Sequence, residues 1–372
     1  MHAKPGVIFL RSNDIDPDPR VEKQALTLQS AGYDVQIIGW SRQDDRSRKT
    51  RGLSGLNIKR VAIRAPHGAG ISNILSLAAF QFSLLWILIR KRRQYQVIHA
   101  CNLDTGIVGL LVGRLLSKRV VYDIFDFYVD AFPVPKALNC FVRKLEIFVI
   151  NNADLTIVCT EDRRKQIEPS APKDLIVIHN SPAMSSPQPM EFDQEKLRIG
   201  FVGTLTQGRF LSELLAISSS RLDIELHVAG FGELDNLFKV AAETQKNVHF
   251  YGKVTYEEGL AISKSCDLMI AMYDPAVPNH KYSAPNKFYE SLILRRPLIT
   301  AKNSGVDSLV NKFNTGFVLE YSYVAFVDFL SSESLASIRE FETGHFSDIY
   351  LNNFSWPEME TRLKKAYKKL LN

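Results

Sequence analysis

Cysteine is scarce in this sequence, and the few thiols are scattered. Cys101, Cys140, Cys159 and Cys266 lie far apart and form no C-x-x-C pair. This spacing argues for neither a disulfide framework nor a zinc site. We therefore expect each cysteine to be a small buried apolar residue, in a chain that works in a reducing compartment.

The sequence also lacks an uninterrupted apolar run that could cross a membrane. Its most hydrophobic stretch, Ile71–Ile89, is broken by serine, asparagine and glutamine, and the basic cluster Arg90–Arg93 follows it directly. Two interpretations stay open: an amphipathic helix lying on an anionic membrane, or a buried crossover helix with a basic end. Residues 1–10 show no signal-peptide pattern. We expect a cytoplasmic protein, in peripheral contact with the inner face of the membrane under the first interpretation.

A strong charge imbalance and the common dinucleotide fingerprint are absent as well. The chain has 46 basic and 40 acidic residues and a net charge of +6, a mild excess that suits an anionic ligand or membrane surface and does not call for nucleic acid. The first strand–helix–strand stretch has no G-x-G-x-x-G. A length of 372 residues predicts two or more domains.

What the sequence does have is a repeated strand–helix–strand pattern. Val7–Leu10 and Val35–Gly39 predict parallel strands, and the apolar spacing from Val21 to Ala31 predicts the amphipathic helix between them. The pattern restarts at Leu197–Gly203, after Ser181–Pro189, whose serines and prolines are typical of a linker. The expected division is residues 1–182, a linker at 183–195, residues 196–352 and a final helical segment at 353–372.

The most informative stretch is Ser283–Thr300. Pro285 suits the first turn of a helix, and the residues that follow form an apolar stripe up to Pro297, which we expect to end the helix before a short strand. The helix N-terminus offers free N–H groups and a partial positive charge that suit a phosphate. Lys287 adds a formal charge there, and Glu290 could accept hydrogen bonds from a ribose diol. Alternatively, both side chains are solvated helix residues.

This stretch, SAPNKFYESLILRRPLIT, resembles the donor-site helix of the retaining GT-B nucleotide-sugar glycosyltransferases, the family 4-like enzymes with a "group 1" domain. Further resemblances follow in the family's order along the second half. The resemblance implies a donor site made of Gly203, Arg209, Gly230, Gly252, Val254, Asn286, Lys287 and Glu290. Glu290 would grip the nucleotide ribose, Gly203 and Arg209 would face the donor phosphates, and the turn at Gly252 would read the base.

Three positions depart from the family pattern. Tyr282 stands where many members have an earlier glutamate, and Phe125 stands where a histidine often lies near the donor sugar. Thr204 replaces the arginine that usually follows Gly203. The departures leave recognition of the donor sugar open.

The resemblance implies an α/β fold of GT-B type: two Rossmann-like αβα domains facing a central cleft, with the last helix crossing back to the first domain. The first domain would bind the acceptor, and the second would bind a UDP-sugar. The UDP-sugar is a co-substrate, and we expect no cofactor. Asp126, Lys287 and Arg209 would be the catalytic residues of a hexosyl or N-acetylhexosaminyl transfer with retention. Asp14-Ile15-Asp16 and Asp16-Pro17-Asp18 have the letters of a metal motif but lie in the first domain, so we predict no metal site.

The prediction of the acceptor rests only on the acceptors that are common in the resembled family and on one hydrophobic stretch. Both point to a saccharide carried on a polyprenyl diphosphate, in bacterial capsule, exopolysaccharide or O-antigen assembly. Two alternatives stay open. One is a UDP-sugar 2-epimerase on the same fold, and the other is a non-catalytic scaffold that binds a nucleotide sugar or a membrane partner.

Overall fold

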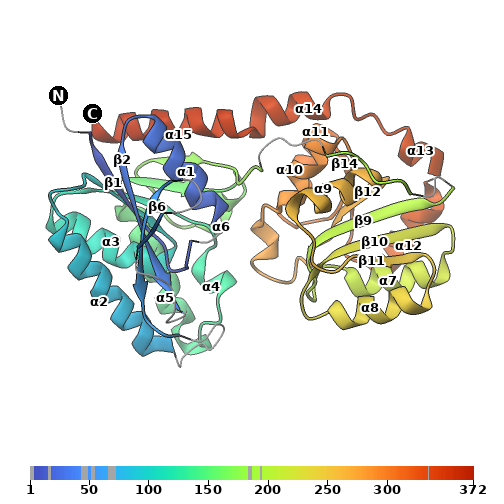
Figure 1. Ribbon diagram of the computed structural model, residues 1–372, viewed down its shortest axis with the longest axis horizontal. Coiled ribbons are helices and arrows are strands. Elements are labelled where there is room, and N and C mark those ends of the chain that lie inside the picture. The colour runs from blue at the N-terminus through green and yellow to red at the C-terminus, as the bar shows by residue number, and fades with distance from the viewer. Residues whose placement is uncertain are drawn as a thin grey trace. The chain divides into compact units, whose positions relative to one another are not determined.

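The chain forms two compact units, Met1–Asn180 with Met359–Asn372 and Ser181–Glu358. The computed structural model describes residues 4–15, 18–42, 49–51, 55–65, 73–182, 187–192, 195–333 and 335–372 (Figure 1). Residues 16 and 17 of the metal-like motif, and residues 183–186 and 193–194 of the expected linker, lie outside the described residues.

The first unit contains an eight-stranded sheet in the order β3-β4-β2-β1-β5-β6-β7-β8, in which β3 and β4 pair antiparallel and every other neighbouring pair is parallel. Its strands are β1 (Gly6–Leu10), β2 (Asp34–Ser41), β3 (Lys49–Arg51), β4 (Asn57–Ala62), β5 (Val97–Cys101), β6 (Arg119–Asp123), β7 (Leu155–Val158) and β8 (Leu175–Val177). Its helices are α1 (Pro19–Ser30), α2 (Ile74–Arg90), α3 (Leu103–Leu115), α4 (Tyr128–Ala131), α5 (Lys136–Asn152), α6 (Arg163–Gln166) and most of α15 (Trp356–Leu371).

The second unit contains a six-stranded, wholly parallel sheet in the order β11-β10-β9-β12-β13-β14. Its strands are β9 (Leu197–Thr204), β10 (Ile224–Phe231), β11 (Val248–Phe250), β12 (Leu268–Ala271), β13 (Leu298–Ala301) and β14 (Gly316–Leu319). Its helices are α7 (Leu211–Ser220), α8 (Asp235–Thr244), α9 (Tyr256–Ser265), η2 (His280–Tyr282), α10 (Asn286–Leu294), α11 (Asp307–Phe313), α12 (Tyr323–Ser332), α13 (Leu335–Arg339), α14 (Phe346–Ile349) and η3 (Tyr350–Phe354). The predicted α/β class with two parallel sheets is confirmed.

Strand order reverses direction in the middle of both sheets. In the first unit this switch point lies between β1 and β5, and in the second between β9 and β12. Open parallel sheets bind ligands beyond the carboxyl ends of the strands at such a point. The topology therefore marks one place in each unit where a site is expected.

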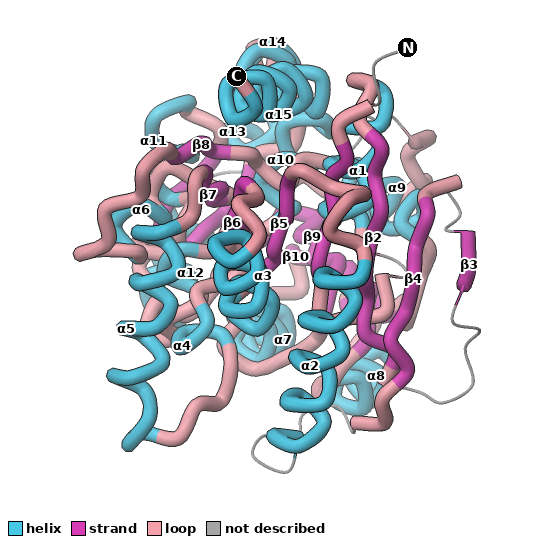
Figure 2. Tube along the Cα trace, turned by 90° about the vertical axis from the view of Figure 1, so that its left-hand side faces the viewer, coloured by secondary structure: helices cyan, strands magenta, loops and turns pink. Residues whose placement is uncertain are grey.

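Three helices cover one face of the first sheet. α5, α3 and α2 lie side by side in front of the strands, with α3 in contact with both of its neighbours (Figure 2). Phe80, Leu84 and Leu88 of α2 pack into the core beside β1 and β5. The opposite side of α2 is exposed, so the described part of the stretch is not the purely buried crossover helix of the second interpretation, and its membrane contact stays a prediction.

The last helix packs on the first unit from Met359 onward. The hydroxyl of Tyr367 lies 2.6 Å from His99 Nδ1 on β5, and Thr27 of α1 donates a hydrogen bond to Glu360. Lys369 forms an ion pair with Asp174. These contacts join the end of the chain to the strands and helices of its beginning.

Two local expectations differ from the structure. Cys140 is exposed on α5, whereas the other three cysteines are buried. Ala137, Phe141 and Lys144 around it are exposed as well, so Cys140 belongs to the exposed side of this helix. The helix expected to run to Pro297 ends at Leu294, because Arg295 adopts a left-handed conformation (φ 52°) and a residue before proline disfavours the helix. Within the described ranges, no helix is both long and apolar enough to cross a bilayer.

Candidate functional site

A cavity of about 440 Å³ lies in the second unit at the carboxyl ends of β9 and β10. The ends of these strands, the segment from Lys253 to Ser263 and the first turns of α10 line it. Seven of the eight residues that the sequence assigned to a donor site line this cavity: Gly203, Arg209, Gly230, Val254, Asn286, Lys287 and Glu290. Gly252 does not line it but accepts a hydrogen bond from the Gly230 N–H (2.8 Å).

Glycine lets the two strand ends approach each other. Gly203 and Gly230 are register partners in β9 and β10. A Cβ atom on Gly230 would lie 1.7 Å from the carbonyl oxygen of Gly203, and one on Gly203 would lie 2.8 Å from Lys287 Nζ. Any larger residue would push backbone or the lysine out of place. The glycines therefore shape the floor of the cavity and allow backbone to approach a ligand.

α10 brings a cation and a carboxylate to the cavity. Lys287 and Glu290 lie one turn apart and are 7% and 8% exposed. Lys287 Nζ sits 4.3 Å from the centre of the Phe201 ring, a cation–π contact that holds the ammonium over β9. Burial raises the pKa of Glu290, against the opposing effects of Lys287 and of a hydrogen bond from Tyr256. A buried carboxylate of this kind needs hydrogen-bond donors, which a ligand's hydroxyl groups would supply.

Arg209 enters the cavity from the loop before α7. Its guanidinium lies 5.1 Å from the Tyr273 ring, and its buried Nε has no hydrogen-bond partner among the described residues. The aromatic ring holds the guanidinium in place, and the guanidinium keeps an unused N–H donor. Such a group can donate a hydrogen bond to an anionic oxygen. Arg209 precedes this helix, which begins at Leu211.

Sequence reasoning missed several residues that line the same cavity. The hydroxyl of Tyr256 donates a hydrogen bond to Glu290 Oε1 (3.2 Å), and Lys253 and Thr255 lie next to it. A sequence signal for this region exists, because Thr255 and Glu258 form a capping box at the start of α9. That pattern marks the helix start that brings Tyr256 to Glu290.

The predicted residue Asp126 belongs to the first unit, where its carboxylate accepts a hydrogen bond from Arg163 (3.4 Å). Phe125, which departs from the family pattern, is flanked by Arg11 and Arg20, whose guanidinium carbons lie 4.2 and 4.6 Å from its ring centre. Tyr282, another departure, lies in the short helix η2 of the second unit. The Phe125 ring thus makes cation–π contacts with two arginines, which would repel a protonated imidazole at the same position.

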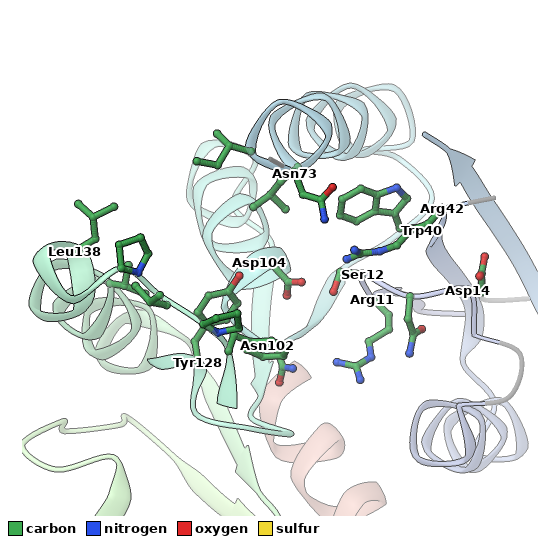
Figure 3. Close-up of a pocket in the computed structure, with 18 of the residues that line it drawn as sticks. Arg11, Ser12, Asp14, Trp40, Arg42, Asn73, Asn102, Asp104, Tyr128 and Leu138 are labelled. Atoms are coloured by element: carbon green, nitrogen blue, oxygen red, sulfur yellow. The ribbon is translucent and has the colours of Figure 1, made fainter. Parts of the chain in front are cut away.

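A second and larger cavity, of about 800 Å³, lies at the switch point of the first unit. Arg11, Arg42 and Asp104 are among its polar lining residues, and Leu138 of α5 and Leu77 of α2 are among its apolar ones. Figure 3 shows Asp104 and Asn102 near the middle, Leu138 on one side, and Trp40 and Arg42 on the other. Burial raises the pKa of Asp104 against the opposing effects of Ser12, Arg11 and Arg42. The cavity therefore combines a charged floor with apolar walls.

Two clusters of described residues have the side chains of a metal site, and neither lines the donor cavity. They are His99 with Cys101 and Asp123, and Glu225 with His227 and His249. Their own contacts disfavour a metal ion.

In the first cluster, Arg20 and Gln24 already donate hydrogen bonds to Asp123. In the second, the rings of His227 and His249 stack nearly parallel at 4.6 Å. One ion cannot lie in the planes of two stacked rings, which ligation requires. We therefore interpret the two clusters as parts of the packing and hydrogen bonding of their sheets.

Comparisons with known proteins agree with this geometry. Residues 17–184 match the Glycosyl transferase 4-like domain, and residues 196–331 match the Glycosyl transferases group 1 domain. No curated relative matches the chain.

Solved structures with the same fold include sucrose-phosphate synthase from Thermosynechococcus elongatus, with a TM-score of 0.75, 15% identity, and coverage of 98% of this chain and 99% of that one. Anabaena HepE in complex with UDP-glucose has a TM-score of 0.70 at 13% identity, over 98% and 99% of the two chains. The lipopolysaccharide outer core galactosyltransferase WaaB has a TM-score of 0.66 at 14% identity, also over 98% and 99%. With a family 4-like domain followed by a group 1 domain on two parallel α/β sheets, the chain belongs to the GT-B glycosyltransferases.

Proposed function

We propose that this glycosyltransferase takes its sugar from a UDP-sugar bound in the cavity of the second unit. The observation that carries the proposal is the convergence of Glu290, Lys287 and Arg209 with two glycine-ended strands on one cavity at a switch point. These side chains match the parts of a nucleoside diphosphate. The carboxylate can bind the ribose hydroxyls, and the two cations can bind the phosphates. The complex of HepE with UDP-glucose supports the choice of uridine.

In this proposal, the diphosphate lies at the N-terminus of α10. Asn286 and Lys287 begin that helix, whose free N–H groups and dipole favour an anion. Lys287 and Arg209 stabilise the negative charge that develops on the leaving diphosphate, the role a divalent ion plays in metal-dependent enzymes. Glu290 accepts hydrogen bonds from the ribose, and the turn from Gly252 to Val254 contacts the base. Transfer then proceeds with retention and without metal.

The acceptor belongs to the first unit in this proposal, with Asp126 near the hydroxyl that receives a hexosyl or N-acetylhexosaminyl group. We propose a saccharide on a polyprenyl diphosphate, and a place in the assembly of a bacterial cell-surface polysaccharide. The fold shared with WaaB, a lipopolysaccharide outer core galactosyltransferase, supports the cell-surface polysaccharide part of this proposal.

Nucleotide binding tests the donor site directly. We expect UDP to bind in the presence of EDTA, with higher affinity than GDP or ADP, in isothermal titration calorimetry. Glu290→Ala should weaken UDP binding by about 1–3 kcal/mol, because the ribose hydroxyls would lose their buried acceptor.

Glu243→Ala is the matched control, since Glu243 is an exposed glutamate on α8 of the same unit. It should bind UDP like the unaltered protein. If no nucleotide binds, or if both variants bind equally well, the donor-site assignment fails and a scaffold becomes the better explanation. Conversion of the UDP-sugar without any acceptor would instead indicate an epimerase.

A further inference from the structure

The three helices that cover the first sheet are apolar on their outer side as well as on their inner side. Their exposed apolar residues are Ile74, Leu75, Phe82, Trp86 and Ile89 on α2, Ile107, Leu111 and Leu115 on α3, and Leu138, Phe141 and Phe148 on α5. Because α2, α3 and α5 lie side by side, these residues share one face of the unit (Figure 2). A helix of a water-exposed protein normally keeps polar residues on its outer side. We call this face the α2–α3–α5 surface.

Charge on the α2–α3–α5 surface has one sign. The three helices contain only two carboxylates, and neither belongs to the outer side: Asp104 lines the first-unit cavity, and buried Glu146 accepts a hydrogen bond from Tyr122. The exposed charges are basic, and Arg90 and Arg114 stand beside exposed rings, with guanidinium carbons 5.1 and 5.4 Å from the centres of Trp86 and Phe148. Aromatic rings paired with cations suit the boundary between lipid chains and anionic headgroups.

The second unit offers an internal comparison. Its helix α8 also exposes two apolar residues, Leu237 and Val240, but Asp235, Lys239 and Glu243 stand among them. Scattered apolar residues of this kind are ordinary for a protein surface, whereas a contiguous patch marks an interaction site. The exposed side of α8 therefore differs from the α2–α3–α5 surface, because charges of both signs separate its apolar residues.

The first-unit cavity is continuous with this surface. Ile74 and Leu77 from the start of α2, and Leu138 and Val142 from the start of α5, form apolar walls of the cavity. Ile74 and Leu138 are also exposed residues of the surface. A molecule with an apolar chain and a polar head could therefore lie with its chain along the surface and its head toward Arg11 on the cavity floor.

We propose that the α2–α3–α5 surface docks on an anionic lipid bilayer, and that the first-unit cavity takes a phosphate-bearing lipid from that bilayer. The bilayer is chosen over a protein partner because the surface pairs a broad apolar area with charges of one sign, the complement of an anionic membrane. The identification of that lipid as the acceptor rests on the proposed function. Docking itself does not, and can be measured without a donor.

Co-sedimentation with lipid vesicles tests docking. We expect the protein to bind vesicles of phosphatidylcholine and phosphatidylglycerol, to bind phosphatidylcholine vesicles more weakly, and to lose part of its binding at high salt. Phe82→Glu/Trp86→Glu on α2 and Leu111→Glu/Leu115→Glu on α3 should each reduce binding by about tenfold or more. The four side chains are exposed, so the fold should persist, as far-UV circular dichroism can check.

Leu237→Glu/Val240→Glu on α8 is the matched control and should bind vesicles like the unaltered protein. The proposal is overturned if the unaltered protein ignores anionic vesicles, if the α8 variant loses as much binding as the others, or if only the α2 variant has an effect. A dimer in light scattering that the α2 and α3 variants convert to monomer, without vesicle binding, would instead make the surface an interface between two copies. UDP titration of every variant distinguishes a failure of the docking proposal from a failure of the proposed function. A variant that loses vesicle binding but keeps its UDP affinity is impaired in docking alone.

The cavity is tested with farnesyl diphosphate as the probe and inorganic diphosphate as its chain-free counterpart. We expect farnesyl diphosphate to bind more tightly, and Leu138→Glu to remove the difference, because Leu138 contributes to the apolar wall. Equal affinity of the two probes, or binding of farnesyl diphosphate that Leu138→Glu leaves unchanged, would overturn the assignment of a lipid to this cavity.

Discussion

The two units place their cavities at equivalent points of similar sheets but line them with different chemistry. In both, the cavity lies where strand order reverses. The second unit surrounds its smaller cavity with glycine-ended strands, Lys287 and Glu290, whereas the first builds a larger one with walls from α2 and α5. The comparison shows that topology decides where a ligand lies, while side chains decide which ligand it is.

Buried carboxylates reveal a second difference. In the first unit, Asp123 accepts hydrogen bonds from Arg20 and Gln24, and Glu146 accepts them from Tyr122 and the Tyr128 N–H. Glu290 in the second unit receives one hydrogen bond from the described residues, that of Tyr256. We infer that the first two hold the fold together, while Glu290 is kept for a ligand. The following substitutions test this contrast.

The largest effect is expected for Asp123→Asn. Burial raises the pKa of Asp123, but Arg20 and His99 outweigh burial and hold it at about 2. Removing the charge leaves Arg20 buried without its partner, which should lower the free energy of unfolding by about 3–5 kcal/mol in urea denaturation. Because the folded pKa lies below the unfolded value near 4, the contribution of Asp123 is present above that value and is lost as the pH falls through about 2.

Asp223→Asn is the control for this measurement. Asp223 also accepts two hydrogen bonds from an arginine, Arg221, but the pair lies on the surface of the second unit. Solvent screens such a pair, so the loss should stay below about 1 kcal/mol. Similar losses for the two variants would contradict the structural role of the buried pair.

A smaller effect, visible as pH dependence, is expected for Glu146→Gln. Burial raises the pKa of Glu146 to about 7, although Tyr122 and Tyr128 donate hydrogen bonds to it. Between the unfolded pKa near 4 and the folded value, the folded protein binds more protons, so stability contributed by Glu146 falls as the pH rises. From pH 5 to pH 8 the unaltered protein should lose roughly 3 kcal/mol relative to Glu146→Gln in urea denaturation. Parallel pH profiles for the two proteins would refute the raised pKa.

The smallest effect, and the one that most sharpens the contrast, is expected for Glu290→Gln. Since burial raises the pKa of Glu290, its ionised form costs stability in the ligand-free protein above the unfolded pKa. The glutamine variant should therefore unfold at a higher temperature near pH 7.5, with a gain of up to about 1 kcal/mol, while it binds UDP more weakly. A variant that loses both stability and UDP affinity would show that Glu290 supports the fold, like Asp123.

Much of the second unit could be predicted from its sequence. The strand Leu197–Gly203 and the helix after Pro285 were visible as apolar patterns, and Gly203, Gly230 and Glu290 could be matched to a family pattern in the right order. Local signals suffice there because most of the donor-site residues lie at the end of a strand or in the first turns of a helix. Tyr256 was missed because its role depends on the contact between α9 and α10, which no local pattern specifies.

The first unit was less predictable. α2 was recognised as hydrophobic, but its sequence could not tell a buried helix from a surface helix, since the helix is apolar on both sides. Arg11 and Arg42 could not be assigned to one cavity from the sequence, because they follow different strands and are brought together only by the sheet. The ion pair of Arg20 with Asp123 joins residues about a hundred positions apart, and no local pattern indicates that the two side chains meet.

The amino-acid sequence by itself determined the two parallel α/β units and the order of the donor-site residues, because apolar periodicity, glycine and helix-start signals act within a few residues. Only the tertiary structure decided that Glu290 meets Tyr256, that α2, α3 and α5 share one apolar face, and that the two cavities differ in lining. These features depend on which helices pack side by side. That choice is made by the burial of distant apolar residues against a common sheet, and not by any single segment of the chain.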